Sequence, residues 1–265
     1  MVGADGGEDA SMARSAVSQR VEELWVSLAG VTTSFPADGV QVVVAAGSRL
    51  CPPAWVGIVV LGNSGLATAP DAVTARFLRE SLAGRPLRSA VGAGRWSGKP
   101  GVVDVLGPAS LAYLDEQEFR PAAEARGVVH LPPGHLDLAR LVAEVSGEDM
   151  AESGIGEISS PAFVVRDRAR VVAAAGYREW PGAVAHISVL TSARFRGRGL
   201  ARAVASAAVA EALGNNLLPQ WRARNEPSRR VARRLGFREL GGQVSIRFAS
   251  YQVQRNGDRR PPPRQ

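Results

Sequence analysis

Apolar residues recur at helical spacing in several stretches of the chain. Between residues 20 and 28, Val21, Leu24, Trp25 and Leu28 fall on one face of a helix, which is typical of a helix packed on a core. Similar spacing predicts further helices over 71–83, 136–145, 200–213 and 227–235. Asp71 stands where a helix cap is expected, and Pro108 in a first turn predicts one more helix over 108–114.

Short apolar or alternating runs predict strands between these helices. The predicted strands are residues 41–45, 55–61, 102–106, 162–166, 170–179, 184–190, 220–224, 237–240 and 244–249. Gly241 and Gly242 lie between the last two runs and predict a hairpin. Strands and helices in this order predict a mixed sheet with helices packed on it, an α/β fold of the mixed α+β type.

Composition and periodicity divide the chain into four segments. Residues 1–17 are small and polar without periodicity, and 253–265 are basic and contain three consecutive prolines, so both are predicted to be disordered. Residues 18–130 form a predicted N-terminal α/β domain, and 131–252 form a second α/β domain that carries the motifs described below.

The overall composition favours a folded cytoplasmic protein. Apolar residues make up 45% of the chain, which supports a core, and there is neither a membrane-spanning run nor a signal peptide. Cys51 is the only cysteine, and His130 and His135 lack further ligands, so we expect no disulfide and no metal. The net charge of +7 suggests nucleic-acid binding, but only 6% of residues are aromatic, and abundant arginine, alanine and glycine indicate a compositional bias instead.

Two glycines and three arginines alternate where the helix over 200–213 begins. Gly197 and Gly199 permit a tight turn with a close approach of a ligand to the backbone, and unpaired amides at a helix start favour an anion. Arg194, Arg196 and Arg198 add positive charge, which suits a diphosphate. The turn contains no lysine for a Walker loop, and Arg202 replaces the third glycine of a dinucleotide fingerprint.

The segment VLTSARFRGRGLARAV resembles motif A of the GNAT superfamily of acyl-CoA N-acyltransferases. The later segment ARNEPSRRVARRLGFREL is similar to a second conserved region of that family, and the resemblance covers about residues 135–250. It implies a GNAT-like mixed sheet with two splayed strands and flanking helices. The segment VVDVLGPASLAYLDEQEFRP resembles the region ahead of the core in some bacterial members, so the smaller N-terminal domain is expected to be a degenerate half of the same fold.

The resemblance implies acetyl-CoA as a co-substrate, with its pyrophosphate on the amides of residues 196–201 and its pantetheine arm between the splayed strands. A backbone N–H near Val189 or Leu190 would polarise the thioester oxygen. The implied CoA-binding residues are Ile187, Val189, Leu190, Arg194, Arg196, Gly197, Arg198, Gly199, Leu200, Ala201 and Asn225.

The catalytic residues are less well defined. Many family members carry a tyrosine that protonates the leaving thiolate, and the alignment places Ala232 there. Candidates for the general base are Glu179, His186 and Glu157, with Glu152 in the same loop region as Glu157. For His186 a core or surface role stays open, and for Glu179 a role in the turn beside Trp180-Pro-Gly.

The sequence therefore predicts transfer of an acetyl group from acetyl-CoA to a primary amine of a small molecule or protein. A CoA-binding protein without catalysis is the alternative, because Ala232 replaces the tyrosine. A nucleic-acid-binding protein is disfavoured, no membrane partner is expected, and a homodimer stays open.

Overall fold

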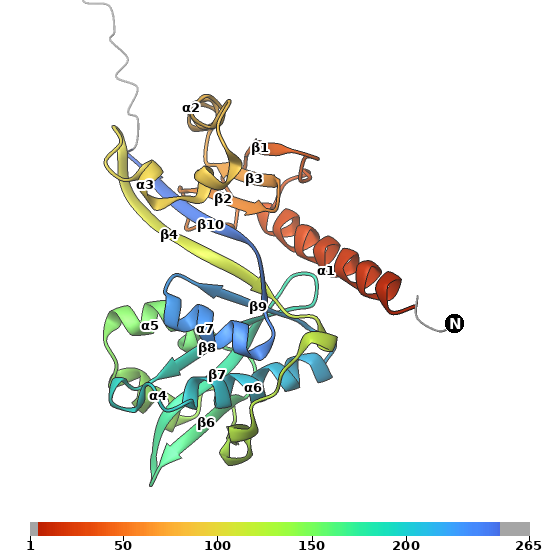
Figure 1. Ribbon diagram of the computed structural model, residues 1–265. Helices are drawn as coiled ribbons and strands as arrows, with labels where there is room; N and C mark the ends of the chain where they lie inside the picture. The colour runs from red at the N-terminus through yellow and green to blue at the C-terminus, as the bar shows by residue number, and fades with distance from the viewer. Residues whose placement is uncertain (1–4, 250–265) are drawn as a thin grey trace, which may run out of the picture.

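The computed structural model describes residues 5–249, which form one ten-stranded sheet with helices on both faces (Figure 1). The helices are α1 Asp5–Ala29, α2 Ala72–Leu82, α3 Ala93–Trp96, α4 Leu136–Ala143, α5 Gly147–Ser153, α6 Leu200–Gly214 and α7 Glu226–Leu235. The strands are β1 Gly39–Val44, β2 Val56–Leu61, β3 Ser64–Ala69, β4 Val102–Tyr113, β5 Val129–Leu131, β6 Ala162–Asp167, β7 Arg170–Trp180, β8 Val184–Thr191, β9 Leu218–Ala223 and β10 Arg238–Phe248. Short 3₁₀ turns include η4 Ile155–Glu157 and η5 Ala193–Phe195. The mixed α/β architecture predicted from the sequence is confirmed.

The strand order β1-β3-β2-β10-β4-β9-β8-β7-β6-β5 interleaves the two ends of the chain. Strand β10, near the C-terminus, pairs antiparallel with both β2 and β4, and β4 pairs antiparallel with β9 (Figure 1). The N-terminal part therefore contributes β4, which pairs with β9, and the C-terminal part contributes β10, which pairs with β2. The boundary predicted near residue 130 does not divide the sheet, because both parts complete it.

Strand β10 runs straight through the two glycines that predicted a hairpin, so this prediction is wrong. A Cβ atom on Gly241 would lie 1.8 Å from the carbonyl oxygen of Val60 on β2. Neither Gly241 nor Gly242 has a positive φ. Glycine is required here for the close approach of two strands rather than for a turn.

The predicted helix over 108–114 is also wrong, because β4 continues through this segment to Tyr113. Pro108 lies where the register between β4 and β10 shifts, between the pairs Ala109↔Gln243 and Leu106↔Ser245. Proline has no N–H to donate to a ladder, and it is tolerated at such irregularities.

Helix α1 begins at Asp5, within the segment 1–17 for which the sequence predicts disorder. The helix is anchored further along by Val21, Leu24 and Trp25, which are buried, and the indole Nε1 of Trp25 donates to Tyr113 Oη at 2.8 Å. Once an anchored helix exists, each added residue gains a backbone hydrogen bond, which extends it toward the N-terminus. Residues 1–4 and the predicted disordered tail 253–265 lie outside the described residues.

The two faces of the sheet near β8 and β9 are covered by different helices. Helices α6 and α7 pack on one face, in a core that includes Ala185, Ile187, Trp221 and Ala223. On the opposite face, α1 packs against Val184, Leu218 and neighbouring residues, and α4 packs beside Leu190. Side chains that alternate along β8 and β9 therefore reach two separate layers.

Candidate active site

Strands β8 and β9 pair in parallel over three residue pairs and then separate. The pairs are Val184↔Leu218, Ala185↔Pro219 and His186↔Gln220, whereas β8 continues to Thr191 and β9 to Ala223. A cavity of about 560 Å³ lies at this opening. The facing backbone edges of the separated segments are therefore available to a ligand that lies between them as an extra strand would.

A glycine turn forms the mouth of this cavity. Gly197 and Gly199 have φ angles of +77° and +78°, and α6 begins at the next residue, Leu200. No side chain caps this helix start, and the amides of a first helical turn have no intrahelical acceptor. No atom lies within 4 Å of the position of a Cβ on either glycine, so the backbone is open to an anion, which the helix dipole also favours.

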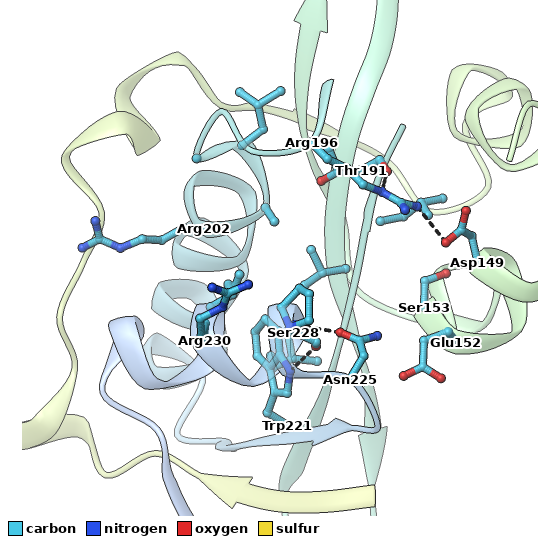
Figure 2. A pocket seen from close by; sticks show the side chains of 18 of the residues that line it. Asp149, Glu152, Ser153, Thr191, Arg196, Arg202, Trp221, Asn225, Ser228 and Arg230 are labelled. Atoms are coloured by element: carbon cyan, nitrogen blue, oxygen red, sulfur yellow. Dashed lines mark hydrogen bonds and ion pairs between the residues drawn. The ribbon is translucent and has the colours of Figure 1, made fainter. Parts of the chain in front are cut away.

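The start of α7 forms a second wall. The side chain of Asn225 caps α7, since its Oδ1 accepts a hydrogen bond from Ser228 N at 2.9 Å (Figure 2). The indole Nε1 of Trp221 donates to Ser228 Oγ at 3.0 Å, which holds β9 and α7 together. Capping uses the oxygen of the Asn225 amide and leaves its two N–H donors for a ligand in the cavity.

Helix α5 forms the third wall, and ion pairs attach it to both sides of the opening. Asp149 pairs with Arg196 of the glycine turn at 2.7 Å, and Arg196 Nε also donates to Thr191 O at 3.3 Å (Figure 2). The hydrogen bond from Arg196 lowers the pKa of the Asp149 carboxyl. Glu152 pairs with Arg224, just beyond β9. These contacts place α5 across the space between β8 and β9.

Most of the residues expected to bind CoA line this single cavity. They are Ile187, Val189, Leu190, Arg196, Gly197, Gly199, Leu200, Ala201 and Asn225. Arg194 and Arg198 differ from the expectation, because they line a neighbouring cavity of about 1020 Å³. Arg198 Nη2 donates to Arg194 O at 3.4 Å, and its guanidinium lies 5.0 Å from the ring centre of Phe195. Of the three arginines of the turn, only Arg196 reaches the cavity between the strands.

None of the three predicted general bases lines the cavity. His186 stacks on Trp180 with ring centres 4.2 Å apart, and its Nδ1 contacts Gln220 Oε1. Burial, together with the charge of Arg222, lowers the pKa of His186 to about 4, so its imidazole is neutral at pH 7. The His186 side chain is therefore packed against Trp180 and Gln220, in line with the core or surface role that the sequence analysis left open.

The two acidic candidates lie at exposed positions. Glu157, in η4, pairs with Arg178 at 2.8 Å. Glu179 lies near the end of β7, where its backbone N–H donates to Ser159 Oγ at 3.3 Å. Neither carboxylate lines the opening between β8 and β9. Ala232, which the sequence resemblance aligned with a tyrosine, is buried on the core face of α7.

Glu152 of α5, named with Glu157 in the sequence analysis, lines the cavity. Further lining residues were not among the expected site residues: Asp149 and Ser153 of α5, Trp221 and Arg222 of β9, and Pro227, Ser228, Arg230, Val231 and Arg234 of α7. The α7 set repeats at helical spacing, so helical periodicity would have found it once Asn225 was chosen. The α5 set lies about 45 residues before the glycine turn, and no local motif connects the two.

The described residues contain no group of three or more histidine, cysteine, aspartate or glutamate side chains that could hold a metal ion. Among the helices of residues 5–249, none combines the length and apolar character needed to cross a bilayer. Burial raises the pKa of Cys51 to about 11, and its Sγ donates to Trp55 O, so this thiol is a packed side chain.

Comparisons with known proteins agree with this geometry. Residues 146–241, which include α5, β8, α6, β9 and α7, match the GNAT acetyltransferase family. A GCN5-related N-acetyltransferase from Kribbella flavida is 15% identical, with a TM-score of 0.50 over 89% of this chain and 97% of that one, which shows a shared fold along nearly the whole length.

Two further solved structures match with lower TM-scores. A GCN5-related N-acetyltransferase-like protein from Streptococcus suis 89/1591 is 16% identical, with a TM-score of 0.47 over 90% of this chain and 99% of that one. A GNAT-family protein from Novosphingobium aromaticivorans DSM 12444 is 24% identical, with a TM-score of 0.46 over 57% and 69%. No curated protein matches the chain. The family match supports a GNAT acetyltransferase domain over residues 146–241.

Proposed function

We propose that this protein transfers an acetyl group from acetyl-CoA to a primary amine. The observation that carries the proposal is the opening between β8 and β9, with the uncapped start of α6 at its mouth. The residues present fit CoA, because an open cradle around Gly197 and Gly199 suits a diphosphate and two unpaired strand edges suit an extended amide-containing arm.

Each wall of the cavity has a role in holding CoA. The first-turn amides of α6 and the guanidinium of Arg196 bind the diphosphate. The Nδ2 group of Asn225 donates to a carbonyl of the pantetheine arm, since its oxygen is already used in the cap of α7. Arg230 and Arg234, exposed on the face of α7 that lines the cavity, provide charge for the 3′-phosphate.

The residues of β8 orient the reaction. The thioester supplies an activated acetyl group, and the amine nitrogen forms a bond to its carbonyl carbon. The carbon–sulfur bond then breaks, so that the sulfur leaves as a thiolate. The nitrogen gives its extra proton to solvent. A backbone N–H at Val189 or Leu190 donates to the thioester oxygen, where negative charge develops. With Ala232 buried, no tyrosine protonates the sulfur, but a thiol with a pKa of about 8.5 is a competent leaving group.

Two measurements test the proposal in order. Isothermal titration of the protein with CoA measures binding, and a colorimetric assay for free thiol measures turnover of acetyl-CoA with a panel of amines. Binding together with amine-dependent thiol release is the expected result. Binding without thiol release for any amine supports the non-catalytic alternative, and absence of CoA binding refutes both readings.

A further inference from the structure

Arg222 of β9 lines the cavity on the side of α5. It alternates with Trp221 and Ala223, which pack under α6 and α7, so its side chain projects to the opposite face of the sheet. Its Nη1 lies 3.4 Å from Gln243 Oε1, a long contact, while Gln243 itself donates to Leu50 O. The guanidinium thus retains most of its N–H donors for a ligand.

The neighbouring arginines on this face are neutralised, but Arg222 is not. Arg224 pairs with Glu152, and Arg178 pairs with Glu157 at 2.8 Å. Within residues 5–249, Arg222 forms no ion pair with a carboxylate. The nearby His186 is neutral at pH 7. On the side of α5, the cavity therefore carries the charge of Arg222 without a carboxylate that pairs with it among residues 5–249.

The side chain of Arg222 is exposed, so a ligand in the cavity can reach its guanidinium. An arginine without a carboxylate partner gains most from an anion that hydrogen-bonds it directly. A guanidinium fits a carboxylate with two parallel hydrogen bonds, whereas it repels an acceptor that carries only an ammonium group.

We propose that the acceptor is a free amino acid, whose carboxylate pairs with Arg222 while its amine faces the opening between β8 and β9. This assignment rests on the acetyl transfer proposed above and names its substrate class. Simple amines, polyamines and amino-acid amides lack the anion that this cavity selects.

The same pairing helps to form the nucleophile. A free carboxylate stabilises the neighbouring ammonium, so its neutralisation by Arg222 lowers the pKa of the amine toward the value of about 8 found when the carboxylate is absent. More of the bound amine is then neutral at pH 7. This effect favours acetyl transfer in a cavity that Glu157, Glu179 and His186 do not line.

The test compares free amino acids with their own amides in the thiol-release assay at saturating acetyl-CoA. Such pairs differ at the carboxylate and keep the same side chain. For the wild-type protein, kcat/KM is expected to be at least about 10-fold higher for the best amino acid than for its amide.

Arg222→Gln removes the charge and keeps a polar side chain of similar shape. It is expected to lower kcat/KM for the amino acid by about 10- to 100-fold, mainly through KM, and to change that for the amide by less than about 3-fold. Arg178→Gln is the matched control, because the charge of Arg178 is already taken by Glu157. Its expected effect on both substrates is below about 3-fold.

The outcomes separate this inference from the proposed function. If CoA does not bind the wild-type protein, the proposed function fails, and the inference fails with it. If CoA binds and amides or simple amines are acetylated as well as amino acids, or if no amino acid is acetylated, only the inference is overturned. Equal losses for acid and amide in Arg222→Gln also overturn it, because they indicate a general structural effect.

Discussion

Replacement of Gly197 by valine tests whether a diphosphate binds at the start of α6. The backbone at Gly197 has a φ of +77°, a left-handed conformation that β-branched residues avoid. No atom of the protein lies within 4 Å of the added Cβ, so the cost to the fold is conformational rather than steric. We expect the free energy of unfolding to fall by about 2 kcal/mol.

The expected effect on CoA binding is larger and has a different cause. The valine methyl groups would occupy the open space over the amides of the turn, where the diphosphate is proposed to lie. Two charge-assisted hydrogen bonds are then lost, each contributing about 1.5–3 kcal/mol. The dissociation constant for CoA, measured by isothermal titration, should rise at least about 100-fold.

Gly98→Val provides a matched control. Gly98 has a φ of +74°, has no neighbouring atom within 4 Å, and does not line the cavity. Urea unfolding should show similar losses of stability for both variants, with normal CoA affinity for Gly98→Val alone. If Gly197→Val binds CoA as tightly as Gly98→Val does, the diphosphate does not bind at this turn.

Three further predictions concern α7, the shared sheet and the buried histidine. Asn225→Asp keeps the oxygen that caps α7 but removes the two amide N–H donors. The melting temperature should therefore stay within about 2 °C of the wild-type value, while KM for acetyl-CoA should rise about 10-fold. An unchanged KM would contradict the proposed role of the amide. Gly241→Ala places a Cβ 1.8 Å from Val60 O and should lower the free energy of unfolding by about 3 kcal/mol. In Gly242→Ala the nearest atom to the new Cβ lies at 3.3 Å, so the loss of stability should be about half as large or less. Equal losses for the two variants would contradict the close approach of β2 and β10. Burial lowers the pKa of His186 to about 4, so the unfolded chain binds a proton at a higher pH than the folded protein does. The free energy of unfolding, measured with urea, should therefore fall by about 2 kcal/mol between pH 7 and pH 5. His186→Gln should remove this fall in stability, and the same pH dependence in that variant would assign it to other groups.

The elements around the candidate site were predicted well because their signals are local. Short apolar runs predicted β7 and β8, and the glycine turn marked the start of α6 at Leu200. Asn225 and Gly236 marked the two ends of α7, where the structure places the N-cap and the C-cap. In each case a residue acts through its own backbone or through neighbours within four positions, so the sequence contains the whole signal.

The predictions failed where a residue acts through a distant strand. Gly241 and Gly242 have the composition of a turn, yet Gly241 is required by the approach of Val60, about 180 residues earlier in the chain. Pro108 has the position of a helix start, yet it lies at a register shift opposite β10. A local pattern cannot distinguish these cases, because the deciding contact comes from the other end of the chain.

The sequence by itself determined the glycine turn, the strand before it, the helix after it and the family resemblance, since these depend on backbone conformation and on short-range hydrogen bonds. Only the tertiary structure decided which charges meet in the cavity. It directs Arg196 into the opening and Arg194 and Arg198 to its neighbour, and it brings α5 across the strands to pair with Arg196 and Arg224. That arrangement leaves Arg222 without an ion pair among residues 5–249, because the direction of a side chain and the partners of its charge are set by segments far apart in the sequence.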